Sequence, residues 1–333
     1  MRFLLDAEQR AFASSLDAML ASADTPSAVR SWADGDHAPG RVLWSRLAEA
    51  GVFALAVPET YEGAGLLPVE LAVAFVELGR HAVPGPVVET VAAAVLLGEL
   101  SALGEPGPAE RLLPGLASGK SVATFAPEGA PALDADAATV LLAVDGRGLW
   151  LAPGPGPVRV SVDRARRLAR AQDGGELLAA GPQVARAALR ALAWARLATA
   201  AQALGVGLAL LGRTVAYVGR RTQFGVPVAS FQAVKHRLAD AMIALEFARP
   251  LLFGAALSMA PAEVAAAKVT ACEAAYATAR AALQLHGAIG YTAEYDLSLW
   301  FTKARALRTA WGTPAECRAE ALAGLSGAGR PRS

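Results

Sequence analysis

The stretch PQVARAALRALAWARLATAAQALGVGLALLGRTVAYV, residues 182–218, decides the fold class of this chain. Its apolar residues recur every three or four positions, which predicts one helix of roughly 35 residues. Gly225 and Pro227 follow and end the helical pattern. A helix of this length and composition needs neighbouring helices to cover its apolar face. We therefore expect a helical bundle in this part of the chain.

Two further long helices follow. Ser230 is placed to N-cap a helix through FQAVKHRLADAMIALEFARPLL, residues 231–252. PAEVAAAKVTACEAAYATARAALQLHG, residues 261–287, predicts a helix that begins at a proline and ends at Gly287. A shorter fourth helix is expected around residues 295–309. Three or four antiparallel helices with alanine at their contacts pack as a bundle.

The first 120 residues also favour helices. Asp6 and Gln9 have capping-box spacing, and the segments RVLWSRLAEAGV (residues 41–52) and PVELAVAFVELGRHAV (residues 68–83) carry apolar residues at helical spacing. Between residues 121 and 181 the pattern changes to short runs bounded by Pro, Gly and Asp, which predicts a few strands. The fold class is therefore mainly α with a small β domain: an N-terminal helical domain (1–120), a shortened β domain (121–181) and a C-terminal bundle (182–333).

Composition excludes several classes of function. A formal net charge of +1 gives no electrostatic footprint for nucleic acid. Two cysteines, Cys272 and Cys317, make no disulfide framework, which favours the cytoplasm. The N-terminal stretch lacks the pattern of an export signal, and Glu89 and Glu99 interrupt the Ala-rich run of residues 89–104, so no membrane span is expected. The histidines show no metal-ligand spacing: His37, His81, His236 and His286.

Two segments could bind a ligand. RRTQFGVPVASFQAVKHRLAD, residues 220–240, places Arg221 at a helix end, where it could clamp a phosphate or pyrophosphate. Taken alone, the stretch favours a plainer interpretation, in which the arginines complement the helix C-terminus and Phe224 plugs the core.

The second segment, QLHGAIGYTAEYDLSLW (residues 284–300), has small residues at Gly287, Ala288 and Gly290 that let a backbone or a flat ligand approach. His286 could be a general base, but a lone histidine near a helix end more often packs or caps.

Together these segments resemble the signatures of the acyl-CoA dehydrogenase family of flavoproteins. The matching stretches are RTQFGVPVASFQAVKHRLADAM (221–242), QLHGAIGYTAEY (284–295) and, further upstream, LAEAGVFALAVPETYEGAGLLPVELAVAFVELGRHA (47–82). The resemblance implies an N-terminal helical domain, a middle β domain and a C-terminal four-helix bundle. It also implies FAD chemistry, in which a carboxylate takes the α proton of an acyl-CoA thioester and flavin N5 accepts the β hydride.

In this family FAD is shared across a subunit interface, and a neighbouring subunit holds its pyrophosphate and adenosine. Carried over by motif, the cofactor-binding contacts on this chain would be Arg221, Phe224, Gln284 and Gly287, with Gln223, Gln232 and Ala288 nearby.

The departures from the family are on the catalytic side. GYTAEYDLSLWFTKARALRTAWGT, residues 290–313, aligns without a gap to the segment whose glutamate is the usual base, and Trp311 stands in its place. An indole has no proton-accepting group near neutral pH. The alternative base position, just before Arg196, is Ala195, so no catalytic residue is assigned to this chain. Other changes on the flavin-ring side are Thr302-Lys303-Ala304 in place of R-D-A, Ala315 in place of Gln, and a shortened acidic turn at residues 126–136.

The favoured hypothesis is a non-catalytic subunit of a heteromeric FAD-dependent acyl-CoA dehydrogenase. A full-length partner would carry the catalytic glutamate in a heterotetramer with two copies of each chain, acting on a bulky substrate such as a steroid side-chain CoA ester. One alternative is a homomeric pseudo-enzyme or binding protein without redox activity. Another is a homomeric enzyme with a displaced base such as Glu246 or Glu294. Trp311 either fills the cavity left by substrate and base or forms a wall of the partner's substrate channel.

Overall fold

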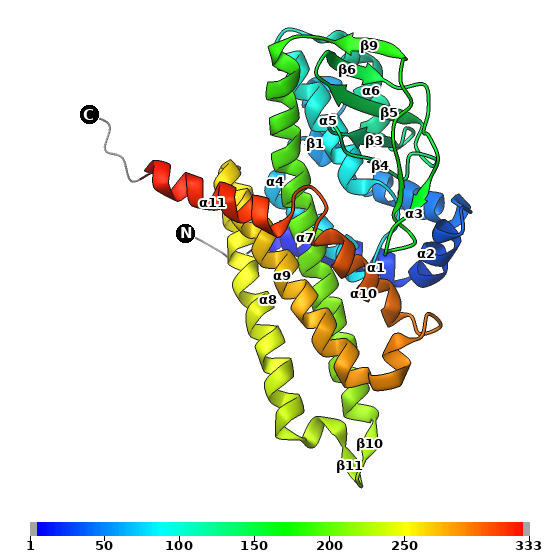
Figure 1. Cartoon of the computed structure of the whole chain (residues 1–333), viewed down its shortest axis with the longest axis vertical. Helices are drawn as coiled ribbons and strands as arrows, with labels where there is room; N and C mark the ends of the chain where they lie inside the picture. The colour runs from blue at the N-terminus through cyan, green and yellow to red at the C-terminus, as the bar shows by residue number, and fades with distance from the viewer. Residues whose placement is uncertain (1–4, 329–333) are drawn as a thin grey trace. The chain divides into compact units, whose positions relative to one another are not determined.

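The computed structural model describes residues 5–328, and its helices and strands are drawn in Figure 1. Residues 1–4, the start of the stretch judged against an export signal, lie outside the described part, as do residues 329–333. The described chain is mainly helical with small sheets, which confirms the expected fold class. It divides into two compact units, one made of residues up to 22, 72–82 and from 196 onward, the other of residues 23–71 and 83–195. The predicted three-domain boundaries stay a prediction.

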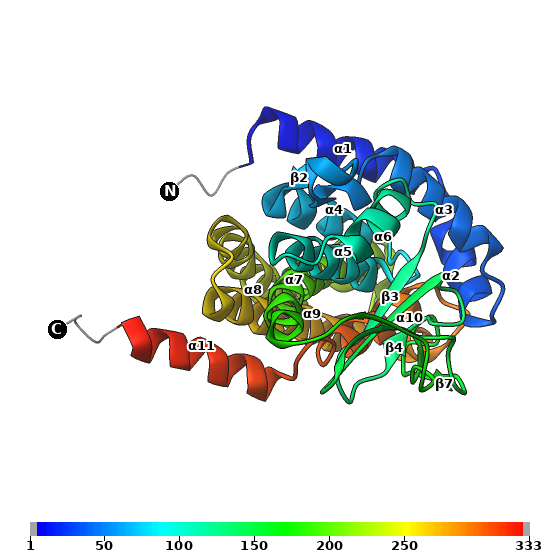
Figure 2. The ribbon, with the colours of Figure 1, turned by 90° about the horizontal axis from the view of Figure 1, so that it is seen from above.

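The first unit contains the predicted bundle. Three long helices run side by side and are seen nearly end-on in Figure 2. They are α7 (Pro182–Arg220) from residue 196 onward, α8 (Gln232–Ser258) and α9 (Pro261–His286). The same unit also contains α1 (Ala7–Ala21), the last part of α4 (Pro68–Arg80), α10 (Leu297–Leu307) and α11 (Pro314–Ala328). Short elements connect them: β10 (Thr222–Gln223), β11 (Val226–Pro227), η3 (Val228–Ser230) and η4 (Gly287–Tyr291).

The helix ends test the expected capping residues. Asp6 and Gln9 form the capping box at the start of α1, as the spacing predicts. The N-cap assigned to Ser230 is wrong, because α8 begins after Phe231, which is extended and makes no side-chain cap bond. The Ser230 hydroxyl instead donates to the carbonyl of Pro227, 2.7 Å away, inside the preceding turn. The third long helix begins at Pro261 and ends at Gly287, as predicted.

Alanine makes the contacts between the long helices short. A buried cluster joins Ala203 and Val206 of α7 to Cys272 and Ala275 of α9, with Trp300 of α10 on the same core. Small side chains let helix axes approach closely, so the Ala-rich composition is a packing requirement of this bundle.

Two glycines allow α4 to cross α7. A β-carbon added to Gly205 would lie 1.9 Å from the carbonyl oxygen of Val76, and one added to Gly79 would lie 2.1 Å from the carbonyl oxygen of Gln202. Both obstacles are backbone atoms, which cannot rotate away.

We therefore expect Gly205→Ala to lower the free energy of unfolding by about 3 kcal/mol, the upper range for an overpacked core. Gly212, on the same helix, is the matched control, because a β-carbon there would meet nothing within 4 Å. Gly212→Ala should raise stability by about 0.5–1 kcal/mol through helix propensity. Urea denaturation followed by circular dichroism measures the free energy of unfolding of both variants. Equal changes in Gly205→Ala and Gly212→Ala would contradict a close backbone contact between α4 and α7.

The second unit joins helices to two sheets. Its helical elements are α2 (Thr25–Ala33), α3 (Ala38–Glu49), η1 (Phe53–Leu55), η2 (Glu59–Tyr61), the first part of α4, α5 (Val87–Ala102), α6 (Gly107–Ala117) and the first part of α7. A short hairpin pairs β1 (Ala56–Val57) with β2 (Gly65–Leu66). The Ala-rich run expected to be a helix rather than a membrane span is α5, which is buried on almost all sides. It contacts β3 through the Thr90 hydroxyl, which donates to the carbonyl of Ala123 at 2.6 Å.

The strands fall where the sequence pattern changes. A four-stranded sheet has the order β3 (Ala123–Ala126), β5 (Val140–Asp145), β6 (Gly148–Leu151) and β9 (Glu176–Ala179). A three-stranded sheet has the order β4 (Ala132–Leu133), β8 (Arg167–Ala169) and β7 (Arg159–Val160). Only β3 and β5 pair in parallel among the strands described here, with Ala123 opposite Val140.

Two helices, α7 and α8, are long and apolar enough to cross a membrane by length and composition alone. In α7, 78% of the most apolar window is buried inside the protein, as expected for the central helix of a bundle. In α8 only 39% of that window is buried, so this helix keeps an apolar face toward the outside of the chain.

Candidate cofactor-binding site

A tight hairpin presents Phe224 at one end of the bundle. Thr222 pairs with Pro227 and Gln223 pairs with Val226, which leaves Phe224 and Gly225 as a two-residue loop. Both have positive φ, 54° and 80°, as a hairpin turn of this length requires. This conformation is strained for a bulky residue such as phenylalanine. The side chain is 92% exposed, so the prediction that Phe224 plugs the core of this chain is wrong.

Arg221 is connected to the end of α9. Its guanidinium donates to the hydroxyl of Tyr217 at 2.7 Å, and that hydroxyl donates to the carbonyl of His286 at 3.3 Å. The rings of Tyr217 and His286 are stacked with centroids 4.1 Å apart. Tyr217 and His286 are 69 residues apart in sequence, and their contact brings the two segments singled out in the sequence together at one end of the bundle (Figure 1).

All seven predicted cofactor contacts are exposed. The first three lie in and before the hairpin, one in the first turn of α8, and the rest at the end of α9 and in η4: Arg221, Gln223, Phe224, Gln232, Gln284, Gly287 and Ala288. Gly287 has φ of 64°, and a β-carbon there would meet nothing within 4 Å. Open space around these residues leaves room for a ligand brought from outside the chain.

A cavity of about 490 Å³ lies between α8 and α9 and includes Gln284 in its wall. The same wall carries Arg237 and Arg280, with Asp240 beside them and alanines over much of the remaining surface. Two guanidinium groups in a concave surface suit an anionic ligand such as a phosphate. Neither arginine was predicted from the sequence as a binding residue. Arg280 stands four residues before Gln284, and this spacing puts the two side chains on one face of a helix. The spacing could therefore have identified Arg280 as a neighbour of a predicted cofactor contact.

His286 is a packing residue. It is 1% exposed, and its Nδ1 lies 2.8 Å from the carbonyl of Ala282, so Nδ1 is the protonated nitrogen. The Nε2 atom is buried with no hydrogen-bond partner in residues 5–328. Burial lowers the pKa of His286 below its ordinary value, against a smaller opposing effect of the Ala282 carbonyl. The neutral ring stacked on Tyr217 agrees with the expectation that His286 packs.

This burial predicts a pH-dependent loss of stability. Because the pKa of His286 is lower in the folded state, the unfolded state takes up more protons as pH falls below about 6.5, and folding stability is lost there. Between pH 7.5 and pH 5.5 the wild type should therefore lose more folding stability than His286→Gln. Denaturant unfolding at the two pH values measures the difference. His236→Gln, at an exposed histidine, should follow the wild type. Identical dependence of stability on pH in all three proteins would contradict a lowered pKa of His286 in the folded state.

Trp311 lies in a turn between α10 and α11 that buried cations hold in place. Its φ is 57°, and its carbonyl accepts from Arg196 Nε at 2.9 Å. Arg196 also pairs with Glu320 of α11. The Lys268 ammonium, fully buried in α9, donates to the carbonyls of Gly312 and of Arg308, the latter at 2.9 Å.

Neither proposed base position carries a proton acceptor. Trp311 is half-buried, and Ala195 is fully buried. Of the displaced bases considered, Glu246 lies on the outer part of α8 in an ion pair with Arg249 at 3.2 Å, and Glu294 is exposed. The turn has the chemistry of a structural support, with fixed carbonyls and an indole.

Comparisons with known proteins agree on one family. The profile of the acyl-CoA dehydrogenase N-terminal domain matches residues 6–120, and that of the C-terminal domain matches residues 185–321. Acyl-CoA dehydrogenase IpdE2 of Mycobacterium tuberculosis is 34% identical over 283 residues, which cover 84% of this chain and 85% of IpdE2.

Solved structures share the fold over almost the whole chain. A chain of the ChsE4-ChsE5 complex from Mycobacterium tuberculosis superposes with a TM-score of 0.85 at 24% identity, covering 99% of this chain and 100% of that one. A chain of the Tcur3481-Tcur3483 steroid ACAD superposes with a TM-score of 0.81 at 26% identity, covering 96% and 99%.

Proposed function

The chain belongs to the acyl-CoA dehydrogenase family, and from this premise we propose that it is the non-catalytic subunit of a heteromeric FAD-dependent acyl-CoA dehydrogenase. It would hold the nucleotide tail of FAD, while a full-length partner supplies the flavin pocket, the catalytic glutamate and the main substrate site. The observation that carries the proposal is an asymmetry. Arg221, Phe224 and Gln284 stand exposed at one end of the bundle, whereas Trp311 and Ala195 offer no base.

The residues present fit the nucleotide tail. The Arg221 guanidinium would pair with the pyrophosphate, and the open surface at Gly287 would let it approach the end of α9. Phe224 would offer an aromatic surface to the adenosine, and its strained, exposed conformation supports a role outside this chain, since strain often marks binding sites. FAD, when bound, supplies the hydride acceptor for the dehydrogenation. This chain's own residues would bind and orient it.

An exposed apolar face supports the need for a partner. On α8, Ile243, Phe247 and Leu251 follow one another every four residues with exposed fractions of 54%, 70% and 47%. Met242 beside them is 56% exposed. A contiguous apolar stripe of this kind marks a protein interface more often than a free surface.

The relatives support a proposal about the substrate class. The Tcur3481-Tcur3483 structure is of a steroid ACAD, and the ChsE4-ChsE5 structure is a complex of two named chains. We propose that the complex containing this chain acts in the cytoplasm on a bulky acyl-CoA, such as a steroid side-chain CoA ester.

Expression with and without a full-length family member tests the proposal. The chain alone should purify without flavin absorption and without acyl-CoA oxidation. With its partner it should co-purify as a heterotetramer with about one FAD per pair of unlike chains. A colourless homo-oligomer that binds none of the candidate partners would favour a pseudo-enzyme or binding protein. A homo-oligomer of this chain that holds FAD and oxidises acyl-CoA would overturn the proposal.

A further inference from the structure

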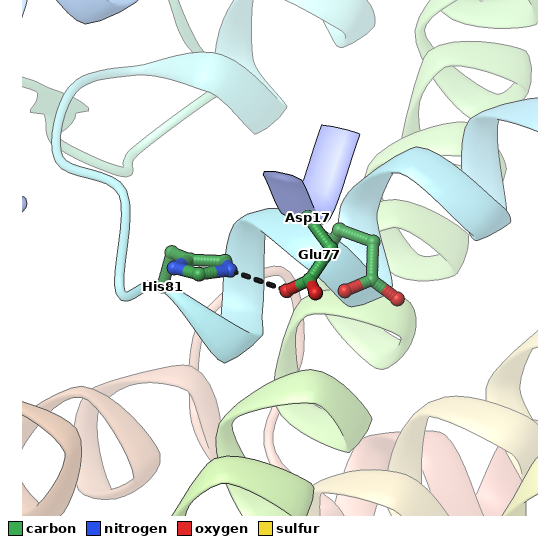
Figure 3. A group of neighbouring side chains, drawn as sticks. All are labelled: Asp17, Glu77 and His81. Atoms are coloured by element: carbon green, nitrogen blue, oxygen red, sulfur yellow. Dashed lines mark hydrogen bonds and ion pairs between the residues drawn. The ribbon is translucent and has the colours of Figure 1, made fainter. Parts of the chain in front are cut away.

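Three side chains of types that can bind a metal ion converge where α1 meets the end of α4. Asp17 comes from α1, Glu77 from α4 and His81 from just beyond it (Figure 3). Their ligand atoms all lie within 4.8 Å of one another, and His81 Nε2 is 2.7 Å from Asp17 Oδ1. All three residues belong to the first compact unit. Helix geometry accounts for two of them, because residues four apart share a face, and the His81 amide still donates to the Glu77 carbonyl at 3.2 Å.

The Glu77 carboxylate is buried next to another carboxylate. The residue is 8% exposed, and one of its carboxyl oxygens lies within 4.8 Å of a ligand atom of Asp17 and of His81. Its contact with Arg80 is an ion pair at 3.3 Å, and Arg80 Nε is itself a buried atom without a hydrogen-bond partner. Burial raises the pKa of Glu77 to about 7 despite this arginine. A buried carboxylate that faces a second carboxylate and an imidazole is an unfavourable arrangement that a cation would relieve.

We propose that Asp17, Glu77 and His81 bind a divalent transition-metal ion, of which zinc is the representative. One imidazole nitrogen and two carboxylates form a mixed ligand set that suits zinc, whereas calcium and magnesium prefer oxygen ligands alone. Three protein ligands leave one position for water, and the side chain of Asp17 is 56% exposed, which gives the ion access from solvent.

Arg80 is the competing cation at this site. Its side chain is 37% exposed, so it can turn toward solvent when an ion takes over the charge of Glu77. The bound ion would connect α1 to the end of α4 and hold the α1 face that buries Leu16 and Leu20. This site is independent of the proposed role in FAD binding.

Titration of the metal-free full-length chain with Co²⁺ and Zn²⁺ tests the site. We expect one ion per chain, visible absorption bands of low-symmetry Co²⁺, and a higher melting temperature with Zn²⁺. Asp17→Asn and His81→Gln should each weaken Zn²⁺ binding at least tenfold. Arg80→Gln should strengthen it several-fold, because the competing charge is removed.

His236→Gln is the matched control, since His236 is exposed on α8 outside the cluster. It should bind Zn²⁺ like the wild type. Asp17 and His81 both reach solvent, so these variants are expected to fold, which circular dichroism verifies. Absence of Zn²⁺ binding, or equal binding by the wild type, Asp17→Asn and His81→Gln, would overturn the proposal.

Discussion

Replacing Arg221 with alanine is expected to remove FAD from the proposed heteromeric complex while the chain itself stays folded. The Arg221 side chain is exposed, and its hydrogen bond to the Tyr217 hydroxyl is its link to the rest of the bundle, so its loss costs little stability. A guanidinium that pairs with a pyrophosphate through charge-assisted bonds contributes about 1.5–3 kcal/mol. FAD affinity should therefore fall about 10- to 100-fold, measured by flavin absorption after gel filtration of the complex.

Arg220 provides the control for this experiment. It precedes Arg221, is also exposed, and its Nε donates to the carbonyl of Ala216 at 3.2 Å within its own helix. Arg220→Ala should leave the FAD content unchanged. Arg221→Lys keeps the charge but loses the planar fork, so its affinity should lie between those of the wild type and Arg221→Ala. If both alanine variants retain FAD equally, Arg221 does not hold the pyrophosphate.

The bundle was predictable because its signals are local. The periodicity of apolar residues predicted the long helices, and Gly225 and Pro227 indicated where the first of them ends. Pro261 and Gly287 indicated both ends of α9. The prediction that Ser230 caps α8 was wrong, because the sequence does not show whether the hydroxyl bonds to the helix that follows or to the turn that precedes it. Contacts over long distances in sequence were also hidden, since Gly205 inside a helix looks only like a weak helix former.

The candidate site was predictable in part. Motif resemblance identified residues such as Arg221 and Gln284, but only the structure shows that Phe224 points out of the chain. The burial of Lys268 and Arg196 was not predicted, because in Ala-rich helices a lone charge usually marks the solvent face. Asp17 and His81 lie 64 residues apart, and no sequence spacing brings such a pair together.

The second large effect is expected at Lys268. Lys268→Met keeps the volume of the side chain but removes the donor to the carbonyls of Arg308 and Gly312. Each buried acceptor left without this bond costs about 1–3 kcal/mol, so the free energy of unfolding should fall by about 3 kcal/mol. Lys235→Met, at an exposed lysine of α8, should change it by less than about 0.5 kcal/mol. Urea denaturation followed by circular dichroism compares the two, and a loss below about 1 kcal/mol for Lys268→Met would contradict the supporting role.

A double variant shows what the two buried cations do together. Lys268 and Arg196 bind successive carbonyls of the same turn, those of Gly312 and Trp311. Once one support is gone the turn can relax, so the effects of Lys268→Met and Arg196→Met should sum to more than the effect of the double variant. Additive effects would mean that the turn is not one rigid unit. A rigid turn would fix the Trp311 backbone through its carbonyl, whichever side chain stands at this position.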